Sequence, residues 1–268
     1  MELDRLERLR ERFLELHEAG TFVLPNPYDV GSARLLEALG FQALATTSAG
    51  FAGTLGRPDM RVSRDELLDH VSLIAAAVTV PLNVDSERCF ADDPAGVAAT
   101  VSALAERGAA GCSIEDWDPA TQGIDDLEIA VARVGAAAEA AAAQHVVLTA
   151  RCENHLHGIN DLDDTIRRLC AYRDAGAPVL YAPGLVDLAD INKVVEAVQA
   201  PLNVLLLPGG PTVAQLAAIG VRRVSLGSAL ARIAHGAVVA AAREVLSAGS
   251  LAAGSMPDAA LLRQAFTA

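Results

Sequence analysis

Three carboxylates are placed where they could bind a divalent metal ion. Asp85 and Glu87 follow the apolar run VPLNV, and Glu115 ends the next such run, GCSIE. Hard cations such as Mg²⁺ take oxygen ligands and keep several waters, so a few carboxylates at neighbouring strand ends are enough. Converging like charges repel one another unless a cation or a proton lies among them. The pattern therefore predicts a metal site.

An ion-paired cluster is the alternative for these acids. Arg88 adjoins Glu87, and Arg151 directly follows the apolar run VVLTA. A guanidinium at a strand end suits a carboxylate or phosphonate group of a substrate, because it offers paired hydrogen bonds. It could equally form an ion pair with Glu153 or Glu115, so both interpretations stay open.

Eight short apolar runs alternate with longer amphipathic segments and set the expected fold. Strands are expected near Phe22, Gln42, Leu82, Cys112, Val147, Leu180, Val204 and Val224, and helices over 29–40, 64–78, 94–107, 125–144, 161–176 and 187–199. Near-continuous apolar strands separated by helices predict a parallel sheet buried on both faces, which at this length closes into a (β/α)8 barrel of the TIM type. An open doubly wound sheet is disfavoured, because PNPYDVGSA replaces the Gly-rich dinucleotide turn after the first run.

Composition and charge limit the class of protein. The 268 residues are 52% hydrophobic, which predicts one barrel domain over 1–268 with additional C-terminal helices over 228–268. A net charge of −13 argues against nucleic acid and anionic membranes as partners. The four cysteines form no CxxC pair and no apolar leader opens the chain, so a cytoplasmic location is expected.

Barrel enzymes place their catalytic groups at the carboxyl ends of the strands. The residues at those positions are Tyr28, Asp29, Thr47, Ser48, Ala49, Gly50, Asp85, Glu87, Glu115, Asp116, Arg151, Glu153, Asn154, Tyr181, Asn203, Ser225 and Gly227. This set is rich in acids and contains one arginine. Asp29, just before GSARLLEALG, is expected to cap a helix instead.

Several motifs resemble the isocitrate lyase/phosphoenolpyruvate mutase superfamily. They are NPYDVGSARLLEALGF, TTSAGFAGTLGRPDM, PLNVDSE, GCSIED, TARCEN and LPGGPTVAQLAAIGVRRVSLGSAL, and they follow one another in family order over nearly the whole chain. The resemblance implies a magnesium-dependent (β/α)8 barrel that acts on small 2-oxo or 2-hydroxy acids. Mn²⁺ would be a possible substitute for Mg²⁺.

The resemblance also implies roles for individual residues. Asp85 would be the direct metal ligand, with Glu87 and Glu115 holding metal-bound water. Asp59 would be an outer partner, and Arg151, Glu115 and Asp59 are the expected catalytic residues. The expected substrate-binding residues are Tyr28, Ser48, Ala49, Gly50, Asp85, Arg151, Glu153, Asn154 and Asn203.

The implied reaction is carbon–carbon cleavage beside a 2-oxo group through a metal-stabilised enolpyruvate intermediate. Oxaloacetate and methylisocitrate-like acids are candidate substrates for such a lyase. A phosphonopyruvate or phosphoenolpyruvate mutase or hydrolase, acting on a C–P bond, is the alternative. A 2-oxo acid binding protein without turnover is a third possibility.

The loop after the fourth strand departs from the family pattern. Lyases of the family carry a Lys/Cys/Gly/His segment there, whereas this chain has EDWDPATQGIDD. Cys112 and Cys152 lie outside the loop and are expected to be small buried apolar residues. His155 and His157 could carry the proton or form a solvated loop pair. Decarboxylation of oxaloacetate, or retro-aldol cleavage with another proton carrier, therefore fits better than cleavage by a loop cysteine.

The segment SALARIAHGAVVAAAREVLSAG predicts a long apolar helix beyond the eighth strand. The resemblance implies that such helices exchange between subunits and build dimers paired into tetramers. Packing onto its own barrel is the alternative.

Overall fold

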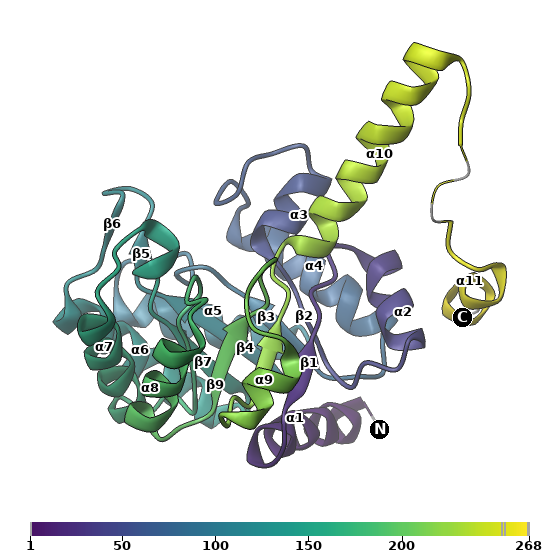
Figure 1. Ribbon diagram of the computed structural model, residues 1–268. Helices are drawn as coiled ribbons and strands as arrows, with labels where there is room; N and C mark the ends of the chain where they lie inside the picture. Colours follow the sequence, from purple (N-terminus) through teal and green to yellow (C-terminus); the bar gives the residue numbers. More distant parts are fainter. Residues whose placement is uncertain (1, 253, 255, 267–268) are drawn as a thin grey trace.

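The computed structural model describes residues 2–252, 254 and 256–266, and in them the chain forms an eight-stranded parallel barrel (Figure 1). The strands are β1 (Phe22–Leu24), β2 (Leu44–Ala45), β3 (Leu82–Asp85), β4 (Gly111–Glu115), β7 (Val147–Arg151), β8 (Val179–Tyr181), β9 (Leu202–Leu205) and β10 (Arg223–Ser225). Their order in the sheet is β1-β10-β9-β8-β7-β4-β3-β2. The predicted (β/α)8 architecture is confirmed.

The two edges of the sheet, β1 and β2, meet just beyond their strands. The Ala45 amide donates to the Pro25 carbonyl oxygen at 3.0 Å, and the Asn26 side-chain amide donates to the Thr46 carbonyl oxygen at 2.9 Å. These bonds nearly close the barrel. All strand ends that carry polar side chains therefore surround one mouth.

Six of the seven helices that cover the barrel lie close to the predicted ranges, and the last, α9, had no predicted range. They are α2 (Val30–Ala38), α4 (Arg64–Ala77), α5 (Pro94–Glu106), α6 (Leu127–Ala143), α7 (Leu162–Asp174), α8 (Leu188–Val198) and α9 (Val213–Ala218). Asp29 caps α2, as predicted, and its carboxylate accepts from the Ser32 amide at 2.6 Å. The cap satisfies an amide that would otherwise have no partner at the helix start.

Four elements were not among the predicted ones: α1 (Glu2–Glu18), α3 (Ser48–Thr54), the single-turn helix η1 (His155–His157), and a hairpin of β5 (Trp117–Asp118) and β6 (Gly123–Ile124). The segment TTSAGFAG, part of one superfamily motif, forms α3, because the Thr47 hydroxyl caps the helix by accepting from the Gly50 amide. The two glycines of this segment lower its helix propensity, so the helix depends on tertiary contacts for its stability.

The core consists mainly of alanine, valine and leucine, with α1 at the amino-terminal end of the barrel. Phe13 of α1 packs with Phe22 in a small cluster there, beside the larger aliphatic core. Cys112 and Cys152 are fully buried, which confirms that they are small apolar core residues. All four cysteines are free thiols.

The C-terminal helices extend away from the barrel (Figure 1). Helix α10 (Ala229–Ala248) projects from the mouth, and α11 (Ala259–Phe266) packs against α2. Apolar side chains of α10 are left exposed, among them Val238 at 68% and Leu246 at 87%. None of the described helices is long and apolar enough to cross a membrane.

Candidate active site

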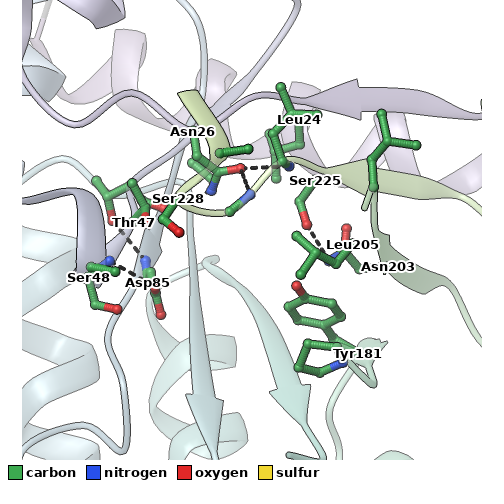
Figure 2. A pocket seen from close by; sticks show the side chains of 18 of the residues that line it. Leu24, Asn26, Thr47, Ser48, Asp85, Tyr181, Asn203, Leu205, Ser225 and Ser228 are labelled. Atoms are coloured by element: carbon green, nitrogen blue, oxygen red, sulfur yellow. Dashed lines mark hydrogen bonds between the residues drawn. The ribbon is translucent and has the colours of Figure 1, made fainter. Parts of the chain in front are cut away.

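A cavity of about 580 Å³ opens at the carboxyl ends of the strands. Six of the predicted site residues line it: Ser48, Ala49, Asp59, Asp85, Arg151 and Asn203. Figure 2 shows Ser48 and Asp85 on one side and Tyr181, Asn203 and Leu205 on the other. Barrel closure thus brings together residues from β2, β3, β7 and β9.

Arg151 lies at the centre of the acidic residues. Its Nη1 is 2.8 Å from Asp85 Oδ1, its Nη2 is 3.2 Å from Glu115 Oε2, and its Nε is 2.8 Å from Glu153 Oε1. The Tyr181 ring centroid lies 5.4 Å from the guanidinium carbon. Arg151 therefore forms the ion-paired arrangement that was the alternative to a metal site, while Arg88 pairs elsewhere, with Asp118 and Asp125.

One guanidinium does not balance the carboxylates around it. Burial raises the pKa of Glu87 to about 8, and the charges of Asp85 and Asp59 add to that rise. Burial also raises the pKa of Glu115 well above its ordinary value, and desolvation together with Asp85 raises that of Asp59. The Glu87 backbone carbonyl oxygen accepts from the Glu115 amide at 3.1 Å, but its carboxylate has no hydrogen-bond or ion-pair partner in the described part of the chain. The site has an excess of negative charge, which favours binding of a cation.

The donor set fits a hard divalent cation. In the described residues no three His, Cys, Asp or Glu side chains converge closely enough to form a complete ligand cluster. Mg²⁺ does not require one, because it is usually bound by one or two carboxylates and retains several waters. Asp85 as a direct ligand, with Glu87 and Glu115 acting through water, is compatible with this arrangement.

Asp85 is held on both sides by the protein. The Ser48 amide donates to Asp85 Oδ2 at 3.0 Å, while Arg151 donates to Oδ1. Of the three amides expected to bind a substrate carboxylate, that of Ser48 is therefore occupied, and that of Gly50 donates to the Thr47 hydroxyl at 3.3 Å. The Ala49 amide, by contrast, has no protein acceptor within the described residues, and Ala49 lines the cavity.

Comparison with known proteins shows to which family the chain belongs. Residues 13–246 match the family model for phosphoenolpyruvate phosphomutase. The chain belongs to the isocitrate lyase/phosphoenolpyruvate mutase superfamily. It is therefore an enzyme of the carbon–carbon lyase and mutase type.

Three relatives illustrate the range of this superfamily. The chain is 32% identical to probable 2-methylisocitrate lyase 2 of Corynebacterium glutamicum, over 84% of this chain and 76% of the relative. It is 32% identical to oxaloacetate decarboxylase of Paraburkholderia xenovorans, over 75% and 69%. A solved structure from Burkholderia cenocepacia J2315, described as a lyase/mutase, is 47% identical with a TM-score of 0.94 and covers 99% of this chain and 98% of its own.

Not every residue that the superfamily resemblance suggested faces the cavity. Tyr28, Gly50, Glu87, Glu115, Glu153 and Asn154 are outside its lining. The Asn154 amide donates to Asp164 at 2.9 Å and to Thr165 at 3.3 Å on α7, because a buried amide must find partners. At Gly50 a Cβ atom would lie 2.5 Å from Thr47 Cγ2 and 3.0 Å from Tyr28 Cβ, so packing favours glycine at this position.

One buried polar residue, Arg223, was missed by the sequence reasoning, and the role of a second, Asp116, was not recognised. Arg223 of β10 lines the cavity and donates to Asn203 and Thr149, both at 3.0 Å, and burial lowers its pKa to about 9. Asp116 accepts from the Tyr172 hydroxyl at 2.5 Å and from the Glu153 amide at 2.9 Å. Asp116 was placed at a strand end, but the partner that gives it a role lies 56 residues away.

The superfamily's variable loop forms the β5–β6 hairpin in this protein. Trp117 stacks on His157 of η1, with ring centroids 3.4 Å apart and planes 6° apart. At its base Asp125 pairs with Arg88 at 3.0 Å and with Arg133 at 2.6 Å. The hairpin is thereby attached both to the turn after β3 and to the turn after β7.

Proposed function

We propose that the protein is a Mg²⁺-dependent lyase that cleaves a carbon–carbon bond beside the 2-oxo or 2-hydroxy group of a small di- or tricarboxylate. Oxaloacetate and methylisocitrate-like acids are the proposed substrates. The observation that carries the proposal is the position of Arg151, which borders the cavity and is surrounded by more carboxylates than it can neutralise. Mn²⁺ is the proposed substitute metal.

Arg151 would bind and orient the substrate. Its guanidinium can donate to the carboxylate and 2-oxo oxygens, and it faces the charge that develops when the bond to the third carbon breaks. Mg²⁺ held by Asp85, with Glu87 and Glu115 behind water, would polarise the 2-oxo group when bound. The Ala49 amide is placed to receive a second carboxylate oxygen.

Asp59 is the proposed proton carrier. It lines the cavity, where burial and the charge of Asp85 raise the pKa of its carboxyl group, and it could protonate the carbon that carries the negative charge after cleavage. This assignment replaces the cysteine that the hairpin lacks. Arg232 of α10 also lines the cavity and offers a cation for a second substrate carboxylate.

A product assay tests the proposal. The protein with Mg²⁺ is incubated separately with oxaloacetate, methylisocitrate and phosphonopyruvate, and pyruvate, phosphate and phosphoenolpyruvate are followed. Pyruvate from either of the first two, lost when the metal is chelated, is the expected result. Pyruvate production that persists in EDTA would contradict the metal-dependent mechanism.

C–P chemistry is the second candidate, because the matching family model is that of a phosphomutase. Phosphate release or phosphoenolpyruvate formation from phosphonopyruvate, without pyruvate from the other two substrates, would establish it instead. Tight binding of oxalate without any turnover would indicate a 2-oxo acid binding protein.

We further propose a homo-oligomer, a dimer of dimers with an exchanged C-terminal helix, in the cytoplasm. The exposed apolar side chains of α10 support the assembly, since a partner would remove them from water. Four free cysteines are compatible with a reducing compartment.

A further inference from the structure

The cavity has an aliphatic side that the proposed chemistry does not use. Six residues, which we call the aliphatic wall, form it: Leu156, Leu205, Leu206, Leu207, Leu226 and Ile233. They come from η1, the end of β9 and the two residues after it, the turn after β10 and the second turn of α10. The strand ends of a barrel normally supply polar catalytic groups, so three consecutive leucines there require a different explanation.

Leu205 of the aliphatic wall lies across the cavity from Asp85. Figure 2 shows Leu205 beside Tyr181 and Asn203, opposite Ser48 and Asp85. A ligand anchored at Arg151 would therefore direct the remainder of its carbon skeleton towards leucine side chains. The cavity volume of about 580 Å³ also exceeds what a four-carbon acid fills.

Part of the aliphatic wall lies outside the two core clusters or is exposed. Leu207 belongs to neither core cluster, and Leu156 and Ile233 are 50% and 68% exposed. Apolar side chains kept at a binding cavity without a packing function gain stability only when an apolar group covers them. Oxaloacetate carries no such group.

We propose that the natural substrate bears an aliphatic substituent beyond the carbon next to its 2-oxo or 2-hydroxy group, and that the aliphatic wall binds it. This inference rests on the proposed function, since Arg151 anchors the acid end. Leu207 is then a specificity-determining residue.

A homologous series of ligands tests this inference without requiring turnover. Pyruvate, 2-oxobutanoate, 2-oxopentanoate and 2-oxohexanoate are titrated into the Mg²⁺-loaded protein by calorimetry, with oxalate as a compact reference. Each buried methylene should tighten binding about fourfold. In Leu207→Ser this gain should shrink for the longer acids, while oxalate affinity stays the same.

Leu73→Ser provides the matched control, because Leu73 is an exposed leucine on α4 outside the cavity. It should retain the full gain per methylene. Equal affinities along the series with oxalate binding intact would overturn the aliphatic inference alone. Equal weakening of all ligands in Leu207→Ser would overturn it as well. Failure of oxalate and every 2-oxo acid to bind would overturn both this inference and the proposed function.

Discussion

Arg151 is the residue on which the site depends, because it connects the ends of β3, β4 and β7. Its three carboxylate partners come from positions 85, 115 and 153. A guanidinium can donate to several acids at once and still face the cavity. No ammonium group could replace that geometry.

Replacing Arg151 by Gln should weaken oxalate binding to the Mg²⁺-loaded protein on the order of 10- to 100-fold, because charge-assisted hydrogen bonds are lost. Arg151→Lys, which keeps the charge without the planar fork, should recover only part of the affinity. Calorimetric titration measures both variants. Full affinity in Arg151→Gln would remove Arg151 from the substrate site.

Glu87 should make the metal-free protein less stable as pH rises. Its pKa is about 8 in the folded state and near 4.5 when unfolded, so between these values the folded state binds more protons. The free energy of unfolding therefore falls with rising pH across that window, by at most about 1.4 kcal/mol per pH unit. Urea titrations in EDTA at pH 5 to 8 measure this slope.

Glu87→Gln should flatten the slope, whereas Glu139→Gln, at an exposed position on α6, should leave it unchanged. Mg²⁺ should restore stability at the alkaline end, since bound cation compensates the ionised carboxylates. A slope that is identical in wild type and Glu87→Gln would contradict this assignment.

At the scale of elements, the β5–β6 hairpin is attached through buried ion pairs rather than through apolar packing. Arg88 pairs with both Asp125 and Asp92, whose side chains are 8% and 94% exposed. Only the buried pair should matter, because breaking a buried pair leaves an uncompensated charge while a solvated pair contributes little.

Asp125→Asn should therefore loosen the hairpin, and Asp92→Asn should not. Trp117 is the only tryptophan of the chain, so its fluorescence reports directly on the stack with His157. A red shift and faster hydrogen exchange over 117–124 are expected in Asp125→Asn, with the far-UV circular dichroism preserved. An equal response of both variants would show that the buried pair does not hold the hairpin.

At the scale of the whole molecule, we expect α10 to provide the surface for the proposed assembly. A helix with Val238 and Leu246 exposed is stable in water only at the cost of solvating its apolar side chains. Light scattering after size-exclusion chromatography should give a mass above that of one 27.8 kDa chain. A charge on this surface should reduce that mass.

Leu246→Glu is the variant expected to dissociate the assembly, with Leu73→Glu on α4 as the control at another exposed leucine. The reason is that a carboxylate buried between subunits without a partner is strongly unfavourable. A monomeric wild-type protein, or an unchanged mass in Leu246→Glu, would contradict the role of α10.

Local patterns in the sequence determined the barrel, its strand positions and the Asp29 cap, because hydrophobic periodicity and capping act over only a few residues. The superfamily motifs likewise located Asp85 and Arg151. Helix α3 and the β5–β6 hairpin were not predicted from the sequence, because their short glycine-containing or polar segments are stabilised by contacts with residues distant in the chain.

Only the tertiary structure decided how the site is arranged. Barrel closure placed Arg151 among the acids, turned Asn154 towards α7 and set Leu205 across the cavity from Asp85. Each outcome depends on which strand ends become neighbours and on which buried groups need partners. Neither is encoded in the spacing of residues along one strand.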